Sequence, residues 1–291
     1  MASASPTKSA LVTGASKGGL GDYLARELHH RGVRVFAAVR TPSKAAHLEE
    51  LGLEIIQLDV QDTESIREAA ALVAHRTGGT LGILINNSGI GLQGSILDVD
   101  MTAARKVFDT NYFGVIEMTQ AFAPLLTKSK GIIINIGSVV GKVPVPFEGV
   151  YNASKAALEQ LSAQLRLELA PFDIDVTHVV TGGIKTEFFD HAAKHEFPPS
   201  SPYYSARETL SKWISGEMQR DFQQTDPKDF ARSVASNALS AKPTRIQYVG
   251  YGSWWAWFFY HCLWHNAMDV LLHQMGVPNM KTILTEPKKS P

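Results

Sequence analysis

The sequence predicts an α/β protein with a doubly wound parallel sheet, a Rossmann fold, of about seven strands. Three observations carry this prediction. Short apolar segments alternate with amphipathic segments of helical length from residue 9 to about residue 249. The first apolar segment runs through a glycine-rich stretch directly into a helix, and no repeat or long linker interrupts the pattern. Such alternation is typical of βαβ units, whose right-handed crossovers place helices on both faces of a parallel sheet.

The predicted strands are short apolar runs, at Ser9–Thr13, Val33–Val39, Glu54–Leu58, Leu81–Ile85, Gly131–Gly137, Ile174–Val180 and Arg245–Val249. Helices are predicted between them where apolar residues share one helical face, at Leu20–Arg31, Thr63–Thr77, Thr102–Leu126, Glu148–Ala170 and Pro227–Leu239. In such a sheet the ligand crevice lies at the carboxyl ends of the strands. Functional residues are therefore expected where the strands end.

Composition narrows the class of protein. The 291 residues are 44% hydrophobic and 19% charged, and Lys plus Arg equals Asp plus Glu at 28 each, so nothing favours a nucleic-acid partner. The single cysteine, Cys262, excludes an internal disulfide framework, and the ten histidines lack the spacing of a metal site. No secretory signal or membrane-spanning apolar run is present. We expect one domain over residues 1–291, with its core at about 8–250, in a cytoplasmic protein that meets membranes at most at their surface.

The glycine-rich stretch Thr13–Gly21 follows the first strand and opens the first helix. Glycines let the backbone approach a pyrophosphate, and the helix N-terminus offers free N–H groups to it. The stretch could also be a plain turn, but its place between the first strand and the first helix favours a dinucleotide site. The predicted cofactor contacts here are Gly14, Ser16, Lys17, Gly19 and Leu20.

The end of the second strand predicts which dinucleotide binds. An acidic residue there would bind a ribose 2′-hydroxyl, whereas this strand ends at Val39 and is followed by Arg40. A guanidinium group pairs with phosphate through its fork of donors, and Lys17 can add a second positive charge. Each residue alone could be a solvated surface charge, but both together favour NADP(H).

Polar residues also follow the third and fourth strands. Asp59 and Val60 are expected beside the adenine, and Asn87 and Gly89, within Asn86–Gly89, are expected to run along the cofactor. Turn formation is the simpler alternative for both segments, because Asn, Asp and Gly favour turns in any case.

A candidate proton donor lies after the fifth strand. Ser138 follows this strand, and Tyr151 and Lys155 lie four residues apart near the start of the next helix, so they share one helical face. A neighbouring ammonium group is expected to lower the pKa of the phenol, and a serine hydroxyl can stabilise charge on a carbonyl oxygen. The same spacing occurs in ordinary surface pairs, so the position downstream of a dinucleotide loop carries the argument.

These residues together resemble the short-chain dehydrogenase/reductase family over about residues 8–250. The resemblance implies a catalytic tetrad of Asn111, Ser138, Tyr151 and Lys155, with Tyr151 and Lys155 also touching the cofactor. It places Gly182, Ile184 and Thr186, after strand six, near the nicotinamide, and it implies a homo-oligomer. The doubled glycine Gly18-Gly19 and the sequence Thr181-Gly182-Gly183 resemble the fungal branch that holds 1-acyldihydroxyacetone-phosphate reductases and secondary-metabolite ketoreductases.

The implied activity is NADPH-dependent reduction of a carbonyl group, with Tyr151 as proton donor. A dehydratase or isomerase on the same fold, or a non-catalytic NADPH-binding regulator, is the alternative. An insertion at about 185–225 is expected to cover a lipophilic ketone, and the crevice lining is predicted to include Val140, Val143, Val145, Pro146, Phe147, Phe188, Phe189 and Phe197.

The C-terminal tail, at about 248–291, is rich in aromatic residues and includes Trp254, Trp255 and Trp257. So large an apolar surface is expected to be buried. Packing against the domain or a second subunit and contact with a membrane surface are both open, because tryptophan favours the lipid headgroup region. His261 and His265 lie four residues apart without a third ligand, so no metal site is predicted there.

Overall fold

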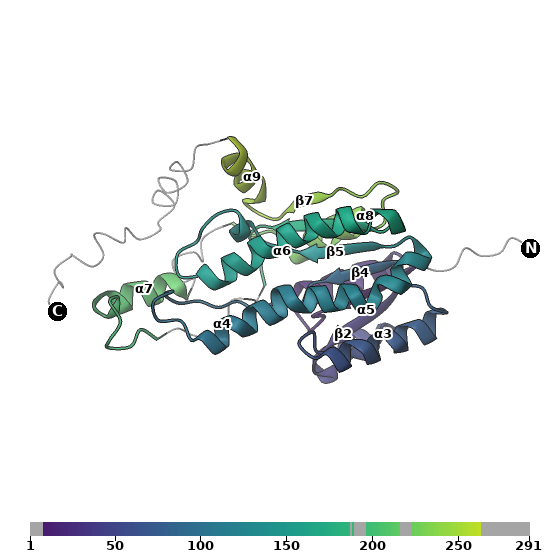
Figure 1. The fold of residues 1–291 in the computed structure, drawn as a ribbon, viewed down its shortest axis with the longest axis horizontal. Helices are drawn as coiled ribbons and strands as arrows, with labels where there is room; N and C mark the ends of the chain where they lie inside the picture. The colour runs from purple at the N-terminus through teal and green to yellow at the C-terminus, as the bar shows by residue number, and fades with distance from the viewer. Residues whose placement is uncertain (1–7, 187, 189–195, 216–222, 263–291) are drawn as a thin grey trace, which may run out of the picture.

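The computed structural model describes residues 8–186, 188, 196–215 and 223–262. Within these residues seven parallel strands form one sheet in the order β3-β2-β1-β4-β5-β6-β7, which confirms the predicted doubly wound fold (Figure 1). The strands are β1 Ser9–Thr13, β2 Arg34–Val39, β3 Glu54–Gln57, β4 Ile83–Asn86, β5 Ile132–Ile136, β6 Asp175–Thr181 and β7 Ile246–Val249.

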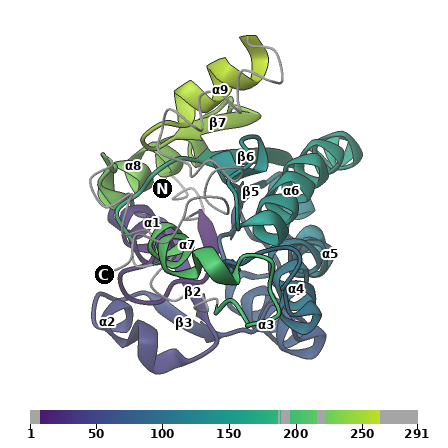
Figure 2. The ribbon, with the colours of Figure 1, turned by 90° about the vertical axis from the view of Figure 1, so that its left-hand side faces the viewer.

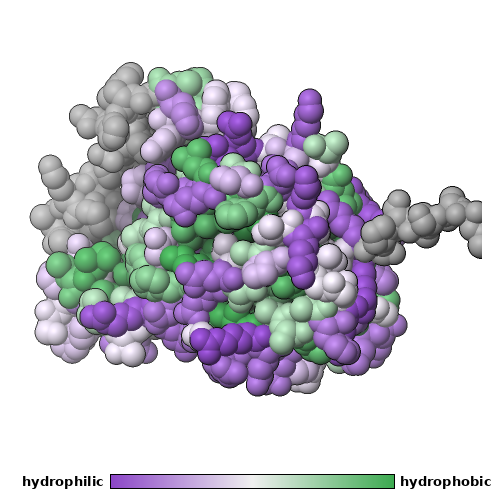
Figure 3. All heavy atoms as spheres, turned by 45° about the vertical axis from the view of Figure 1, so that its right-hand side comes forward, coloured by the Kyte–Doolittle hydropathy of each residue, from purple (hydrophilic) through white to green (hydrophobic). Residues whose placement is uncertain are grey.

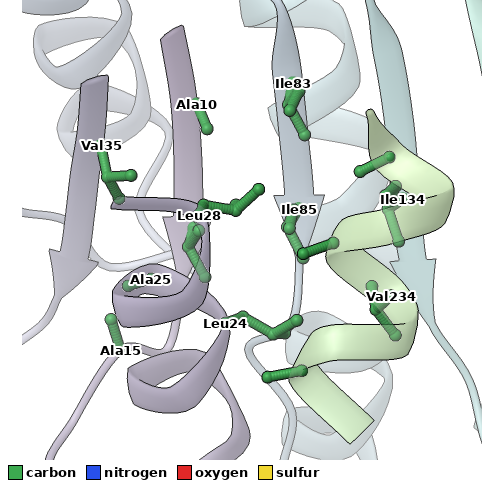
Figure 4. Close-up of a cluster of buried hydrophobic side chains, with 14 of the residues drawn as sticks. Ala10, Ala15, Leu24, Ala25, Leu28, Val35, Ile83, Ile85, Ile134 and Val234 are labelled. Carbon is green, nitrogen blue, oxygen red and sulfur yellow. The ribbon is translucent and has the colours of Figure 1, made fainter. Parts of the chain in front are cut away.

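Two layers of helices cover the sheet. The helices α1 Leu20–His30 and α8 Pro227–Ala238 pack on one face, where Leu24, Leu28 and Val234 meet strand residues such as Ile85 (Figure 4). The other face carries α3 Thr63–Thr77, α5 Gly114–Ser129 and α6 Gly149–Glu168. Because both faces are buried, the strands are apolar along their whole length rather than alternating. Further short elements are the helices α2 Ala46–Glu49 and α4 Met101–Phe108 and the 3₁₀ turns Pro42–Ala45, Val139–Gly141 and Ala170–Phe172.

The helix predicted over Thr102–Leu126 differs from the structure. It begins at Met101, widens into a π-helical turn at Asp109–Phe113, and continues as α5 to Ser129. A Cβ atom on Gly114, the first residue after this turn, would lie 2.6 Å from the Val60 carbonyl oxygen, so the chain passes very close to the end of β3. Single π turns inside helices occur mainly at functional sites, and this one contains Asn111.

The described part of the predicted insertion has a small core of its own. It contains the 3₁₀ turn Tyr204–Ala206 and α7 Arg207–Ile214, with Phe197, Leu210 and Trp213 buried together. Figure 2 shows α7 lying across the carboxyl ends of the strands. Residues 187, 189–195 and 216–222 of the insertion, including the predicted lining residue Phe189, lie outside the described residues.

The helix α9 Ser253–Cys262 follows β7 and projects beyond that edge of the sheet (Figure 2). Trp254 and Trp255 are 57% and 54% exposed, so neither is buried against the domain of its own chain. Residues 263–291 of the tail lie outside the described residues. Among the helices described, none has both the length and the hydrophobicity needed to cross a bilayer. Figure 3 shows a face of the molecule where hydrophilic and hydrophobic side chains are intermixed.

Candidate active site

The glycine-rich loop is held against the end of β4. Gly14 has φ +68°, and a Cβ atom there would lie 3.0 Å from Asn87 Nδ2. A Cβ atom on Gly21 would lie 2.4 Å from the Gly14 carbonyl oxygen, so only glycine fits at that position. Asn87 Nδ2 donates hydrogen bonds to the carbonyl oxygens of Thr13 (2.8 Å) and Gly14 (3.2 Å). The Asn87 side chain therefore shapes the loop, which leaves its backbone for the predicted cofactor contact.

The N-terminus of α1 is open to an anion. Gly19 caps the helix without a side-chain hydrogen bond, and Gly18, at φ +79°, has open space where a Cβ atom would lie. The positive end of the helix dipole and the free N–H groups of Ser16 and Leu20 are therefore accessible to a ligand at this loop. This backbone cradle fits a dinucleotide pyrophosphate.

Asp22, which the sequence analysis did not single out, holds this loop in place through a hydrogen bond. Its buried carboxylate accepts hydrogen bonds from the Gly18 N–H (3.0 Å) and Arg26 Nε (2.8 Å), and His47 Nε2 lies 3.0 Å away. The sequence does show an acidic residue in the first turn of the predicted helix. The burial of Asp22, however, depends on the packing of α2 against α1, which the sequence does not reveal.

Three cationic residues gather beside the end of β2. The Lys17 N–H donates to the Lys44 carbonyl oxygen at 3.0 Å, which ties the glycine-rich loop to the Pro42–Ala45 turn. Arg40 lies between β2 and this turn, and all three side chains are exposed. This arrangement brings the predicted pair Lys17 and Arg40 to one rim of the crevice and adds Lys44, so the rim fits a 2′-phosphate.

The predicted adenine and nicotinamide contacts follow the carboxyl ends of β3 and β6. The Asp59 carboxylate accepts a hydrogen bond from the Gln61 N–H at 3.0 Å, and Val60 is buried. A Cβ atom on Gly182 would lie 2.2 Å from the Tyr251 carbonyl oxygen, so this glycine permits close packing between the ends of β6 and β7. Ile184 pairs with Thr225 in a short parallel bridge, and Thr186 follows it half-buried.

The predicted catalytic phenol is buried beside Ser138. Tyr151 is 5% exposed, and the Ser138 side chain lies close enough to its hydroxyl group to influence its pKa. Burial and the nearby Glu148 raise the pKa of Tyr151 above its ordinary value, and the Ser138 side chain only partly opposes this. The expectation that Lys155 lowers this pKa thus differs from the structure, because burial dominates. The phenol is held in its protonated form, as a proton donor requires.

Lys155 lies deeper in the same site. Its Nζ donates to the Ile136 carbonyl oxygen at 2.9 Å and lies 5.8 Å from the centre of the Tyr151 ring. Burial lowers the pKa of Lys155 to about 8. A Cβ atom on Gly89 would lie 3.6 Å from this Nζ and 3.4 Å from Asn111 Oδ1, so the glycine allows both side chains to approach the end of β4.

Asn111 joins three elements. Its Oδ1 accepts from the Ile90 N–H (2.9 Å), and its Nδ2 donates to the Ile90 carbonyl oxygen (3.0 Å) and Ser154 Oγ (3.0 Å). Both amide atoms are therefore engaged by the protein. The structure brings all four predicted catalytic residues to the same end of the sheet. Among the residues described, no cluster of three or more His, Cys, Asp or Glu side chains could hold a metal ion.

A buried polar chain behind the site was also missed. Asn86 Nδ2 donates to Asn135 Oδ1 (2.9 Å), Asn135 Nδ2 donates to Ser162 Oγ (2.9 Å), and Ser162 Oγ lies 3.2 Å from His178 Nδ1. Burial and the nearby Lys155 and Lys142 lower the pKa of His178 to about 3, so this histidine is neutral. Asn135, Ser162 and His178 stand among apolar neighbours, so the sequence analysis did not single them out.

Fold and site define a dinucleotide-dependent oxidoreductase, and comparison with known proteins gives the family. A family model described as short chain dehydrogenase matches residues 8–196. The chain belongs to the short-chain dehydrogenase family.

Relatives and solved structures agree with this assignment. The chain is 38% identical over 270 residues to the short-chain dehydrogenase cctT of Talaromyces islandicus, covering 92% of this chain and 94% of that protein. It is 36% identical over 255 residues to the NADPH-dependent 1-acyldihydroxyacetone phosphate reductase of Schizosaccharomyces pombe, covering 86% and 81%. A short-chain dehydrogenase from Burkholderia cenocepacia in complex with NADP has a TM-score of 0.67 at 27% identity, with 94% and 98% of the chains covered.

Proposed function

We propose that this NADP(H)-dependent oxidoreductase reduces the carbonyl group of a lipophilic ketone, with Tyr151 as the proton donor. One observation carries the proposal: a buried phenol, close to a serine hydroxyl group, lies beside a buried ammonium group at the carboxyl end of the sheet that bears the glycine-rich loop. When bound, the dinucleotide supplies a hydride for the carbonyl carbon.

The residues of the chain act on the carbonyl oxygen. The hydroxyl groups of Ser138 and Tyr151 hydrogen bond to this oxygen and stabilise the negative charge that develops on it. Tyr151 then gives its proton to the oxygen and leaves a phenolate. The Lys155 ammonium group, close to the ring, stabilises that phenolate during turnover.

The cationic rim selects NADP(H). Arg40, Lys17 and Lys44 would hold the 2′-phosphate of a dinucleotide whose pyrophosphate binds at the α1 N-terminus. No acidic side chain replaces them at the end of β2. The relatives named above as NADPH-dependent or bound to NADP support the same preference.

Aromatic and aliphatic side chains around the phenol support a lipophilic substrate. The Phe188 ring lies 5.8 Å from the Tyr151 ring, and the Phe147 ring contacts Phe197 and Tyr203 of the insertion at 6.0 and 5.5 Å. Ile96, 60% exposed, lies beside the first residue of α6. Ser201 Oγ donates to Asp98 Oδ2 at 2.7 Å, so the insertion is tied to the loop after β4.

A screen of NADPH consumption across ketone classes tests the proposal. Wild-type protein should consume NADPH with lipophilic ketones, and Tyr151→Phe should bind NADPH with similar affinity but lose at least about 100-fold in kcat. Consumption by neither protein, with NADPH bound, would favour a regulator. Conversion of a hydroxy substrate without net NADPH consumption would favour a dehydratase or isomerase.

We also infer that α9 contacts a lipid surface and that the enzyme is a homo-oligomer. Residues 246–268 contain no Asp, Glu, Lys or Arg, and three tryptophans of α9 are at least 37% exposed. Tryptophan is favoured at lipid headgroups. Sedimentation with phosphatidylcholine vesicles should capture the protein, and a Trp254→Ser, Trp255→Ser double variant should stay in the supernatant. If neither protein binds vesicles, and the double variant elutes as a monomer where the wild type elutes as a dimer on gel filtration, α9 would instead be assigned to a subunit contact.

A further inference from the structure

Glu148 is a half-buried residue beside the proposed site, and the reduction itself does not require its carboxyl group. It occupies the N-cap position of α6, where its side chain makes no capping hydrogen bond. The side chain of Gln93, on the loop after β4, lies near the carboxyl group, but the Oε2 atom is buried without a partner. A buried acceptor without a partner is unfavourable unless something else satisfies it.

The backbone just before Glu148 is strained. Phe147 has φ +64°, a value that bulky side chains rarely adopt, and its carbonyl oxygen accepts a 2.6 Å hydrogen bond from the Gly94 N–H. This conformation turns the Phe147 ring towards Phe197 and Tyr203 of the insertion. Residues held in such conformations cluster at ligand sites, where the surrounding structure maintains them.

Glu148 directly precedes α6, and Tyr151 is the third residue of that helix, so the two residues lie close together at the start of α6. The nearby charge on Glu148 raises the pKa of Tyr151. A molecule bound at the phenol therefore lies within reach of the carboxyl group as well.

We propose that Glu148 is a specificity-determining residue that hydrogen bonds to a hydroxyl group of the substrate, a few bonds away from the carbonyl that is reduced. The proposal rests on the proposed function and narrows its substrate class to hydroxy ketones. Burial raises the pKa of Glu148 to about 7, so protonated and ionised forms coexist near neutral pH. A hydroxyl group satisfies both forms because it can accept or donate, whereas a second keto oxygen would be repelled by the ionised form.

Matched ketones test the proposal. The pairs are β-hydroxypropiophenone with propiophenone and α-hydroxyacetophenone with acetophenone. Wild-type kcat/KM should favour the hydroxy ketone of at least one pair by about tenfold or more, since a site built for a hydroxyl group discriminates against its absence. In Glu148→Leu this ratio should fall to within about threefold of unity, and in Glu148→Gln it should be intermediate. Glu168→Gln, an exposed glutamate on the same helix, should keep the wild-type ratio.

NADPH affinity, measured by fluorescence, shows that each variant is folded and separates the two hypotheses. Reduction of plain ketones by wild type with no preference for either hydroxy ketone, or a preference that survives in Glu148→Leu, would overturn the role of Glu148 alone. A stronger preference for β-dimethylaminopropiophenone than for β-hydroxypropiophenone would also overturn it, because the site would then be built for a cation. Failure to reduce any ketone while binding NADPH would refute the proposed function instead.

Discussion

We predict that the buried ammonium group of Lys155 lowers the free energy of unfolding of the protein. The residue is 5% exposed, and its Nζ donates to the Ile136 carbonyl oxygen. Burial lowers its pKa from 10.5 to about 8, which corresponds to about 3 kcal/mol of lost folding free energy at neutral pH. Lys155→Met keeps an unbranched side chain of similar length and removes the charge.

The variant should therefore be more stable but inactive. Removing the charge should stabilise the fold, and loss of the hydrogen bond to Ile136 offsets about 1 kcal/mol of this gain. We expect Lys155→Met to raise the free energy of unfolding by about 2 kcal/mol and Tm by about 5 °C, while kcat/KM falls by at least about 100-fold. Such a trade between stability and activity is common at catalytic sites.

The pH dependence gives the sharper test. The unfolded lysine keeps its proton up to about pH 10.5, whereas the folded one loses it near pH 8. The destabilisation is therefore fully present below pH 8 and fades as the pH rises towards 10.5. Urea unfolding of wild type and Lys155→Met should show that the difference between their free energies of unfolding is smaller at about pH 9.5 than at about pH 7. The control Lys128→Met replaces an exposed lysine of α5 and should change stability by less than about 0.5 kcal/mol. A variant less stable than wild type at neutral pH, or a gap independent of pH, would refute this reasoning.

Three further predictions concern the cofactor loop and the buried histidine. Arg40→Asp should lower the NADPH/NADH ratio of kcat/KM by about 10- to 100-fold, because it replaces a phosphate donor with a repelling charge; an unchanged ratio would remove Arg40 from the phosphate site. Gly21→Ala should weaken NADPH binding at least about tenfold, because its Cβ atom would lie 2.4 Å from the Gly14 carbonyl oxygen. Gly32→Ala, at φ +80° in open space, should cost about 1 kcal/mol of stability through strain but leave binding intact, and equal losses of affinity would contradict the clash. Because His178 has a pKa of about 3 when folded and about 6.5 when unfolded, its contribution to stability is lost progressively below about pH 6.5. His178→Gln should reduce this loss in urea titrations between about pH 7 and pH 5, and an unchanged slope would mean that His178 is not buried as a neutral group.

The fold could be predicted from the sequence because strands buried on both faces of a sheet are apolar along their whole length. Strands such as Ile83–Asn86 and Ile132–Ile136 are buried at every residue. Element ends were less accurate, because they depend on partners that the sequence does not reveal. Leu81, predicted to open a strand, donates its N–H to the Leu125 carbonyl oxygen at the end of α5 rather than to a neighbouring strand.

The site was predictable where residue spacing itself carries the chemistry. Tyr151 and Lys155 are near in sequence, and the resemblance to a known family added Asn111. Glu148 and Asp22 were missed because a lone acidic residue near a helix start usually lies in solvent. Only tertiary packing, from Gln93 in one case and Arg26 in the other, reveals their burial.

The most direct test of the account is a crystal structure with NADP and an alcohol product bound. We predict that the Tyr151 hydroxyl group lies within hydrogen-bond distance, about 2.6–3.2 Å, of the product oxygen. The Ser138 hydroxyl group should contact the same atom, and the nicotinamide ring should lie beside them. A product oxygen out of reach of Tyr151, or a dinucleotide bound away from the Thr13–Gly21 loop, would contradict the account.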